Sequence, residues 1–422
     1  MMPRMHDFAF SRASLRIDVV AGLTVAVVAL PLAIGFGVTS GMTASAGIST
    51  AIVAGILAAI FGGSKFQVSG PTGAMTVILI PVIHHYGVGA IPALGLMAGI
   101  IVMAMGFLHL GDLINRVPWI VVEGFTVGIA IVIALQQLPY VFQVPKGLGD
   151  RTVTSAIGTV STALHGGINW MSVALVAATL IIKFNVVRIV TMLRIKFYVP
   201  ASFIALTLVS IAVAITHLDV ARIGNLPRSL IRVTAPESFF QSFRVLLIPA
   251  IMIALLVAIE SLLSARVADN LMHVPETERF RPNQELFGQG LATAIASMLS
   301  GMPATGAIAR TNVNVRSQAT SRLASLTHAI FLLLIVLLAA PIFGQIPMAA
   351  IAGVLIGTSF RILNPVALRE LLVITNDQRL VFVTTMIMTV AVDLIWGIGT
   401  GLAMYVVSQH IKRLRDRQRA RH

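Results

Sequence analysis

Apolar runs long enough to cross a lipid bilayer recur along the whole chain. A membrane-spanning helix needs about 20 predominantly apolar residues, and by this criterion we count about fourteen segments, two of them short. Hydrophobic residues make up 57% of the 422 residues, more than a soluble domain of this length can hide from water. The alternating pattern of barrel strands is absent. The sequence therefore predicts an all-α polytopic membrane protein surrounded by a lipid bilayer.

Positive charge lies mainly in loops and tails, although a net charge of +14 would also suit a nucleic-acid-binding protein. In membrane proteins, Lys and Arg gather in the cytoplasmic loops. The basic tail at 412–422 therefore predicts a cytoplasmic C-terminus in contact with anionic lipid, and no nucleic-acid partner. An even number of spans places the N-terminal segment, 1–16, on the same side, so we expect both termini to be cytoplasmic.

The stretch 217–244 is the longest polar break between the apolar segments. Its arginines oppose the positive-inside bias, so we interpret it as a connection between two repeats whose topology overrides the local charge. The predicted divisions are the N-terminal segment 1–16, a first repeat 17–216, the connection 217–244, a second repeat 245–411 and the basic tail 412–422.

Residues that carry catalytic or metal chemistry are scarce in this sequence. The chain has no cysteine, which excludes disulfides and thiolate ligands. His84 and His85 close an apolar segment without a carboxylate cluster, so they indicate its watery end and not a metal site. Ser69 lacks the context of a nucleophile turn, and no spaced His/Asp pair accompanies it. We therefore expect no enzyme activity, no metal and no cofactor.

The tripeptide Thr-Gly-Ala occurs at 72–74 and again at 305–307, both times among apolar residues. Pro71 and Pro303, with nearby glycines, prevent a continuous helix there. Matching interruptions in two halves of a chain are the best sequence pointer to a transporter binding site. Each break would begin a half-helix whose free N–H groups and positive dipole end bind anions. The expected substrate-binding residues at the breaks are Gln67, Ser69, Thr72, Gly73, Thr305, Gly306, Ala307 and Arg310.

Two charged residues lie inside apolar segments. Glu260 is the sole charged residue between Val245 and Ala265. A carboxylate there is costly unless it is paired, solvated or protonated, so it indicates a functional site. Ser264 is one helical turn further on, and the two could bind a proton or a cation. Arg310 follows the second break and would add a fixed positive charge for an anion; a structural ion pair between Arg310 and Glu260 is the alternative.

The chain resembles the SulP family of inorganic anion transporters, which are sulfate permease-like. The order and spacing of several motifs together carry this resemblance along nearly the whole chain. They are DVVAGLTVAVVALPLAIGFG (18–37), GGSKFQVSGPTGAMTV (62–77), GFTVGIAIVIALQQLP (124–139), IESLLSARVAD (259–269), NQELFGQG (283–290), GMPATGAIARTNVNVRS (301–317) and VDLIWGIGTGL (392–402).

The resemblance implies a specific architecture. It consists of about fourteen transmembrane segments in two inverted seven-segment repeats, divided into core and gate domains, with half-helices at segments three and ten. The resemblance also implies a homodimer, an elevator-like movement of the core, and a bacterial inner (plasma) membrane location. By similarity, Phe36 lines the anion site, and Glu260 with Ser264 serves the coupling ion. Family members usually continue into a cytoplasmic STAS domain, which we expect this chain to lack.

The sequence and the resemblance together predict a secondary active transporter of a small inorganic oxyanion, most simply sulfate by proton symport with an elevator-type mechanism. Glu260 in place of the aspartate of a sodium-coupled relative favours protons as the coupling ion. Transport of bicarbonate or a C4-dicarboxylate, sodium coupling, and an uncoupled anion exchanger or channel remain open. The role of Glu123 also stays open.

Overall fold

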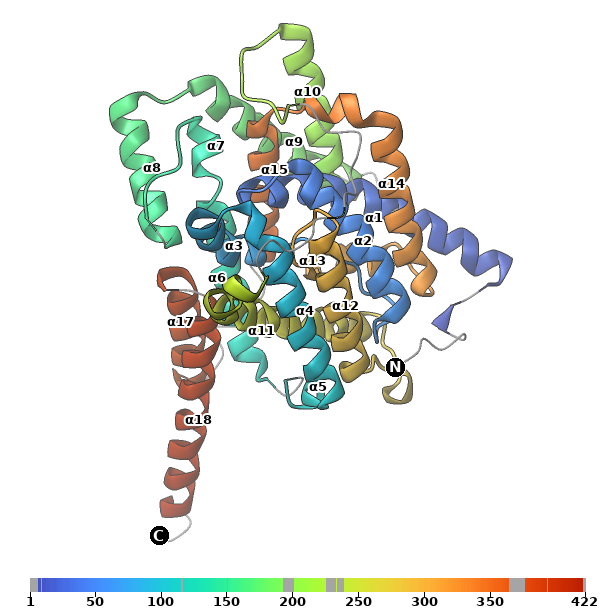
Figure 1. Ribbon diagram of the computed structural model, residues 1–422, viewed down its shortest axis with the longest axis vertical. Helices are drawn as coiled ribbons and strands as arrows, with labels where there is room; N and C mark the ends of the chain where they lie inside the picture. The colour runs from blue at the N-terminus through green and yellow to red at the C-terminus, as the bar shows by residue number, and fades with distance from the viewer. Residues whose placement is uncertain are drawn as a thin grey trace. The chain divides into compact units, whose positions relative to one another are not determined.

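The computed structural model describes residues 7–8, 10–114, 117–149, 151–192, 201–224, 233, 239–363, 376–392 and 394–419. Each of the five predicted divisions has some residues outside the described ranges. Within the described ranges the chain is helical apart from loops and two very short strands (Figure 1). The predicted all-α polytopic fold is confirmed.

The helices and strands follow one another along the chain in this order: α1 (Arg12–Thr39), α2 (Ala44–Phe61), β1 (Ser69–Gly70), α3 (Gly73–Tyr86), η2 (Val88–Ala90), α4 (Ile91–Phe107), α5 (Leu110–Ile114), α6 (Trp119–Leu135), α7 (Leu138–Phe142), α8 (Thr152–Gly166), α9 (Trp170–Met192), α10 (Ala201–Thr216), α11 (Phe239–Leu271), η3 (Glu276–Glu278), α12 (Pro282–Met298), β2 (Thr305–Gly306), α13 (Ile308–Arg316), α14 (Arg322–Gly344), α15 (Met348–Ile362), α17 (Asn376–Ala391) and α18 (Leu394–Arg419).

Six helices within the described ranges are long and apolar enough to cross a membrane. They cover Arg12–Thr39, Ala44–Phe61, Val88–Phe107, Trp119–Phe142, Trp170–Val190 and Phe243–Leu271. Shorter apolar helices cover Gly73–Tyr86, Ala201–Thr216, Arg322–Leu338 and Met348–Ile362. Their length and composition follow from the apolar runs in the sequence, because a helix satisfies its own backbone hydrogen bonds in lipid.

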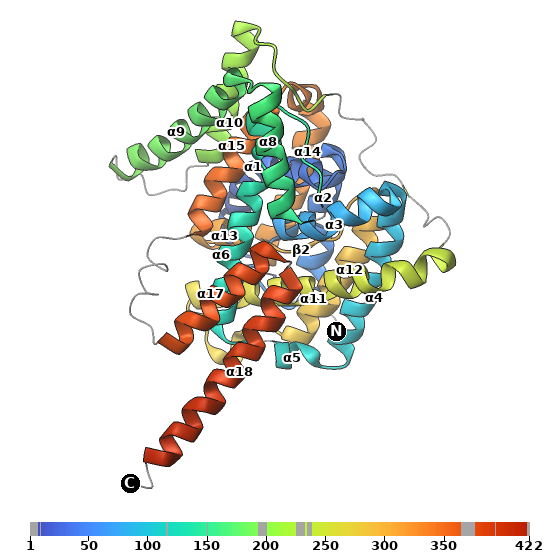
Figure 2. The same cartoon turned by 90° about the vertical axis from the view of Figure 1, so that its left-hand side faces the viewer.

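The chain forms two compact units. The first contains Met1–Asn115, Tyr140–Gln143 and Asn169–Leu355, and the second contains the remaining stretches. In the second unit, α17 and α18 lie side by side (Figure 2) and both pack against α6. All the substrate-binding and coupling residues predicted from the sequence belong to the first unit. The boundaries of the two predicted repeats stay a prediction.

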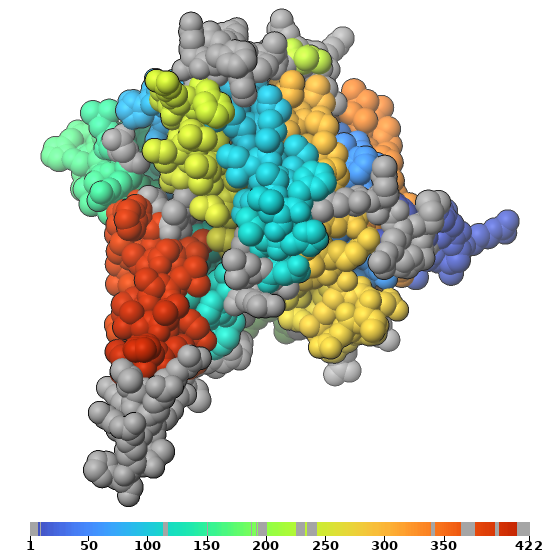
Figure 3. Space-filling view, turned by 60° about the horizontal axis from the view of Figure 1, so that its bottom comes forward, coloured from blue at the N-terminus to red at the C-terminus, as the bar shows by residue number. Residues whose placement is uncertain are grey.

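Within the first unit, α4 lies between α11 and α12 on the face shown in Figure 3. The α4 and α12 backbones approach closely because glycines face each other. A methyl group on Gly99 would lie 2.5 Å from the Gly290 carbonyl oxygen, and one on Gly290 would lie 2.6 Å from the Gly99 oxygen. Small residues at helix contacts are typical of membrane proteins, where close packing replaces the hydrophobic effect.

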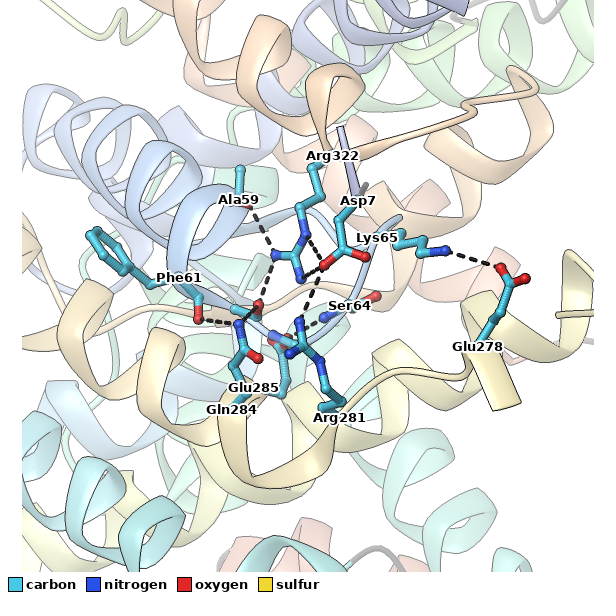
Figure 4. A network of polar contacts seen from close by, with 12 residues as sticks. Asp7, Ala59, Phe61, Ser64, Lys65, Glu278, Arg281, Gln284, Glu285 and Arg322 are labelled. Atoms are coloured by element: carbon cyan, nitrogen blue, oxygen red, sulfur yellow. Dashed lines mark hydrogen bonds and ion pairs between the residues drawn. The ribbon is translucent and has the colours of Figure 1, made fainter. Parts of the chain in front are cut away.

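A buried ionic network holds the loop that leads from α2 to β1 (Figure 4). Asp7 Oδ2 accepts hydrogen bonds from Arg322 Nη2 at 3.1 Å and Arg281 Nη2 at 3.2 Å. Arg322 is 1% exposed, and its Nη1 donates to the Gly62 carbonyl oxygen at 2.7 Å. The network therefore ties the N-terminal residue Asp7 and the start of α14 to the loop that enters the first break.

We expect Asp7→Ala to destabilise the protein by about 3–5 kcal/mol, because removing one partner leaves the buried Arg322 charge uncompensated. Thermal unfolding of the detergent-solubilised protein measures the effect. Glu278→Ala is the matched control. Its carboxylate pairs with Lys65 at 3.1 Å but is 61% exposed, and such surface pairs contribute about 0–1 kcal/mol. Equal melting temperatures for the two variants would contradict the structural role of Asp7.

Candidate functional site

The two predicted breaks meet in the fold. Strand β1 pairs with β2 in antiparallel register, with Ser69 opposite Gly306 and Gly70 opposite Thr305. Helix α3 begins shortly after β1 and helix α13 shortly after β2, so both N-terminal ends lie at this strand crossing, which Figure 2 shows beside α3 and α13. The predicted half-helices are confirmed. The crossing therefore brings together two positive dipole ends from distant parts of the sequence.

The first turns of both half-helices lack side-chain caps. Thr72 occupies the N-cap of α3 and Ala307 that of α13, and neither side chain makes a capping hydrogen bond. The backbone N–H of Ala307 donates to the Val68 carbonyl oxygen at 2.9 Å, and this hydrogen bond extends the pairing of the two breaks. Helix N-termini whose N–H groups are not used by the protein are suited to an anionic ligand.

Two glycines allow the breaks to pack this tightly. A methyl group on Gly306 would overlap the side-chain amide of Gln67. A methyl group on Gly70 would overlap Arg310 Nη1, and Gly70 also has a φ of +153°, which is unfavourable for other residues. Gly306 belongs to the repeated Thr-Gly-Ala tripeptide, whereas Gly70 lies just before the tripeptide of the first break. The tripeptide alone therefore does not contain both of the required glycines.

Helix α11 supplies the acid of the site. Glu260 is 8% exposed, and its Oε2 accepts a hydrogen bond from Thr72 Oγ1 at 3.1 Å. The Thr72 hydroxyl thus joins the acid of α11 to the start of α3. This contact brings together one predicted coupling residue and one predicted substrate-binding residue.

Ser261, the residue after Glu260, fastens α11 to both breaks. Its carbonyl oxygen accepts a hydrogen bond from Gln67 Nε2 at 3.0 Å. Its hydroxyl contacts Thr305 Oγ1 at 2.9 Å and accepts a hydrogen bond from the Gly306 N–H at 3.1 Å. Ser261 could not be identified from the sequence, because a serine within an apolar helix has no distinguishing signature until its partners are known.

Arg310 lies at the crossing and is 1% exposed. Its Nη2 donates to the Pro71 carbonyl oxygen at 2.7 Å, and its Nη1 has no hydrogen-bond partner in the described part of the chain. No ion pair shorter than 4.0 Å joins Arg310 to Glu260 in the same part. The alternative of a direct structural ion pair is therefore absent from this structure.

Two further predicted site residues, Ser264 and Phe36, lie on helices that pack against the half-helices. The Ser264 hydroxyl donates to Thr311 Oγ1 at 3.0 Å, and the same oxygen accepts from the Val68 N–H at 3.1 Å. Ser264 therefore links α11 to α13, and no hydrogen bond from its hydroxyl to Glu260 is present among the described residues. Phe36 is buried near the end of α1, a helix that packs against both α3 and α13.

Helix α12 supports the first break from another side. Gln289 Nε2 donates to Ser69 Oγ at 2.6 Å and to Glu285 Oε1 at 2.8 Å. The second oxygen of Glu285 accepts from the N–H groups of Gly63 at 2.7 Å and Ser64 at 2.9 Å. Glu285 and Gln289 were not among the residues predicted for the site. Their i, i+4 spacing within NQELFGQG is the signal that could have paired them.

The second break is held by two threonines. Thr50 of α2 accepts a hydrogen bond from the Met302 N–H at 2.7 Å, and Thr293 of α12 donates to the Ala304 carbonyl oxygen at 2.8 Å. Non-helical backbone at membrane depth needs such internal partners, because lipid offers none. The crossing is thus a fixed polar site whose extended segments are satisfied by neighbouring helices.

We expect Gly306→Ala to abolish the anion transport that the sequence resemblance implies. The new methyl group would overlap the Gln67 amide, which holds the first break to Ser261, and the crossing would have to open. Uptake of a labelled anion into proteoliposomes measures the loss. Gly166→Ala is the matched control, since a methyl group there has no neighbour within 4 Å. Wild-type uptake by the Gly306 variant would show that the close contact at the crossing is not required.

The crossing brings together two helix N-termini, the buried guanidinium of Arg310 and the carboxylate of Glu260. The carboxylate accepts a hydrogen bond from Thr72 at the start of α3. This arrangement, built from broken helices within a helical membrane protein, is typical of secondary transporters. No group of three or more His, Asp or Glu residues that could hold a metal is present in the portion of the chain that is described.

The chain belongs to the sulfate permease family, whose model matches residues 15–388. A putative sulfate transporter, YvdB of Bacillus subtilis, is 33% identical over 92% of this chain and 72% of its own length. The bicarbonate transporter BicA of Picosynechococcus is 32% identical over 92% of this chain and 69% of its own length. Members of this family are anion transporters and not enzymes, as the sequence predicted.

Solved structures agree with this assignment. The transmembrane domain of a cyanobacterium bicarbonate transporter BicA superposes with a TM-score of 0.80 at 29% identity, covering 92% of this chain and 98% of that one. The murine Solute Carrier 26 family member A9 anion transporter, in its inward-facing state, gives a TM-score of 0.85 at 14% identity, covering 97% and 70%. The second likeness shows the fold alone.

Proposed function

We propose that this protein is a secondary active transporter that moves a small inorganic oxyanion, sulfate, together with protons. The observation that carries the proposal is the crossing itself. Two half-helix N-termini and Arg310 provide a positive site for the anion, and Glu260 lies within hydrogen-bond distance of Thr72 at the start of one half-helix. The anion and the proton would therefore bind at the same crossing, with Thr72 contacting the acid.

Charge at the crossing couples the two ligands. With Glu260 ionised, its charge and that of Arg310 cancel, whereas with Glu260 protonated the pair carries one positive charge. An anion therefore binds more tightly when the acid is protonated, and by linkage the bound anion favours protonation. Such a coupling free energy is typically about 1–3 kcal/mol, or roughly 5- to 150-fold in affinity.

The site supports an elevator-type mechanism because its residues all belong to one compact unit. A unit that carries the complete site could move as a rigid body without breaking the contacts between the two breaks. We also propose that the protein is a homodimer in a bacterial inner membrane, with both termini in the cytoplasm.

Hydrogencarbonate is the second candidate substrate, and a specific observation favours it. Two relatives named as bicarbonate transporters are 32% and 33% identical over 92% and 91% of this chain. A site built from helix dipoles, hydroxyl groups and one guanidinium suits both anions. Sodium in place of protons is the corresponding alternative at Glu260.

Uptake into proteoliposomes tests the proposal. Labelled sulfate, hydrogencarbonate and a C4-dicarboxylate are each offered with an inward proton gradient, an inward sodium gradient or neither. We expect sulfate to accumulate above its external concentration with the proton gradient alone. Accumulation with sodium alone would replace the coupling ion, accumulation of another anion would replace the substrate, and equilibration under every condition would overturn active transport.

A further inference from the structure

His328 is a buried polar residue that is not among the site residues described above. It lies in α14, where the residues that follow it, 329–336, are apolar. Its side chain is 0% exposed, and both ring nitrogens lack a hydrogen-bond partner among the described residues. An unsatisfied buried donor or acceptor costs about 1–3 kcal/mol. A purely structural position in this helix would be better filled by an apolar side chain.

The His328 ring lies close to the first break. Both lie beside Gly55 of α2, since a methyl group built on this glycine would lie 3.9 Å from His328 Cδ2 and 3.9 Å from the Ser69 carbonyl oxygen. Arg310 approaches the next residue, Gly70, with the same Nη1 atom that has no partner.

Two buried donor groups without partners in the described part of the chain therefore lie near Ser69–Gly70. They are Arg310 Nη1 and a ring N–H of His328, and they belong to different helices, α13 and α14. The N-terminal ends of α3 and α13 lie at the same place. An oxyanion is the ligand whose oxygen atoms can accept from both donors while it is stabilised by the helix ends, whereas a cation would be repelled by Arg310.

We propose that His328 is an anion-binding residue of the transport site, which donates a ring N–H to the anion held at the strand crossing beside Arg310. The assignment rests on the proposed function, because it requires that the crossing bind an oxyanion. It adds a donor from α14 to a site otherwise formed by α3, α11 and α13.

The test compares anion binding by the purified full-length protein and its variants. Isothermal titration with sulfate and with hydrogencarbonate gives Kd, and uptake kinetics give KM and kcat separately. We expect His328→Phe, which keeps a ring without a donor, to raise Kd and KM about tenfold or more, since about 1.4 kcal/mol corresponds to tenfold. His328→Gln keeps an N–H donor and should recover part of the affinity.

Thr327→Val is the matched control on the same helix. The Thr327 hydroxyl donates to carbonyl oxygens of Leu323 and Ala324 in its own helix and of Asp18 in α1. None of these belongs to the strand crossing, so its loss should leave Kd unchanged. A second measurement on the wild type avoids dependence on the folding of variants. In the NMR spectrum of protein labelled with ¹⁵N-histidine, adding the anion that binds in the titration should shift one histidine ring signal. That signal should be missing from the spectrum of His328→Gln.

The outcomes separate this assignment from the proposed function. Anion binding by the wild type, with an unchanged Kd for His328→Phe or no anion-dependent shift of the His328 signal, would overturn the assignment alone. Absence of binding by the wild type with either anion would overturn the proposed function and the assignment with it. A raised Kd for His328→Phe together with an anion-dependent shift would establish the contact.

Discussion

Glu260→Gln should abolish proton-driven accumulation of the anion while leaving the exchange of internal for external anion measurable. The amide oxygen can still accept the hydrogen bond that Thr72 donates to Glu260 at 3.1 Å, so the crossing should keep its geometry. The amide cannot take up or release a proton, so the charge at the crossing no longer changes. Paired uptake and counterflow assays in proteoliposomes separate the two activities.

Glu276→Gln is the control for this experiment, because Glu276 is an exposed acid in η3. It should behave as the wild type in both assays. If Glu260→Gln still accumulated the anion against its gradient, Glu260 would have a structural role and the coupling proton would bind elsewhere. If both accumulation and exchange disappeared in a correctly folded variant, Glu260 would be required for anion binding itself.

Arg310→Met should weaken anion binding by about 2–3 kcal/mol, or roughly 30- to 150-fold in Kd, because hydrogen bonds from a charged group contribute more than neutral ones. Methionine fills much of the same buried space without the charge. Arg310→Lys keeps the charge and should bind with intermediate affinity, since a lysine cannot reproduce the planar donor geometry. Titration with sulfate measures Kd for the purified wild type and for both variants.

Arg316→Met is the corresponding control on α13. Arg316 is exposed at the end of this helix, away from its N-terminal turn, so its replacement should leave Kd unchanged. Equal losses of affinity in the Arg310 and Arg316 variants would indicate a general effect of positive charge. An unchanged Kd for Arg310→Met would remove the guanidinium from the anion site.

The two breaks could be predicted from the sequence because their cause is local. A proline beside a nearby glycine favours a helix break, so Pro71 after Gly70 and Pro303 after Gly301 indicated the two breaks. Single prolines elsewhere, Pro31, Pro81 and Pro249, lie inside continuous helices. The register between β1 and β2 could not be predicted in the same way. It depends on contacts between segments far apart in the sequence, such as the one between Gln67 and Ser261.

Helical periodicity predicted the position of Ser264 but not its partner. Its spacing from Glu260 suggested that both would serve one ion, yet the Ser264 hydroxyl donates to Thr311 of another helix. Neutral polar residues such as Ser261 and Gln289 were missed for the same reason. Within a transmembrane sequence their type is compatible with ordinary packing, and only the tertiary contacts distinguish them.

The most direct test of proton-coupled anion transport at the crossing is the steady-state accumulation ratio of the labelled anion as a function of the imposed pH gradient. The membrane potential is clamped at zero in proteoliposomes that contain the wild-type protein. Each pH unit should raise the ratio about tenfold for every proton moved with the anion, since one unit corresponds to about 1.4 kcal/mol. A ratio that does not depend on the pH gradient would contradict proton coupling and the role proposed for Glu260.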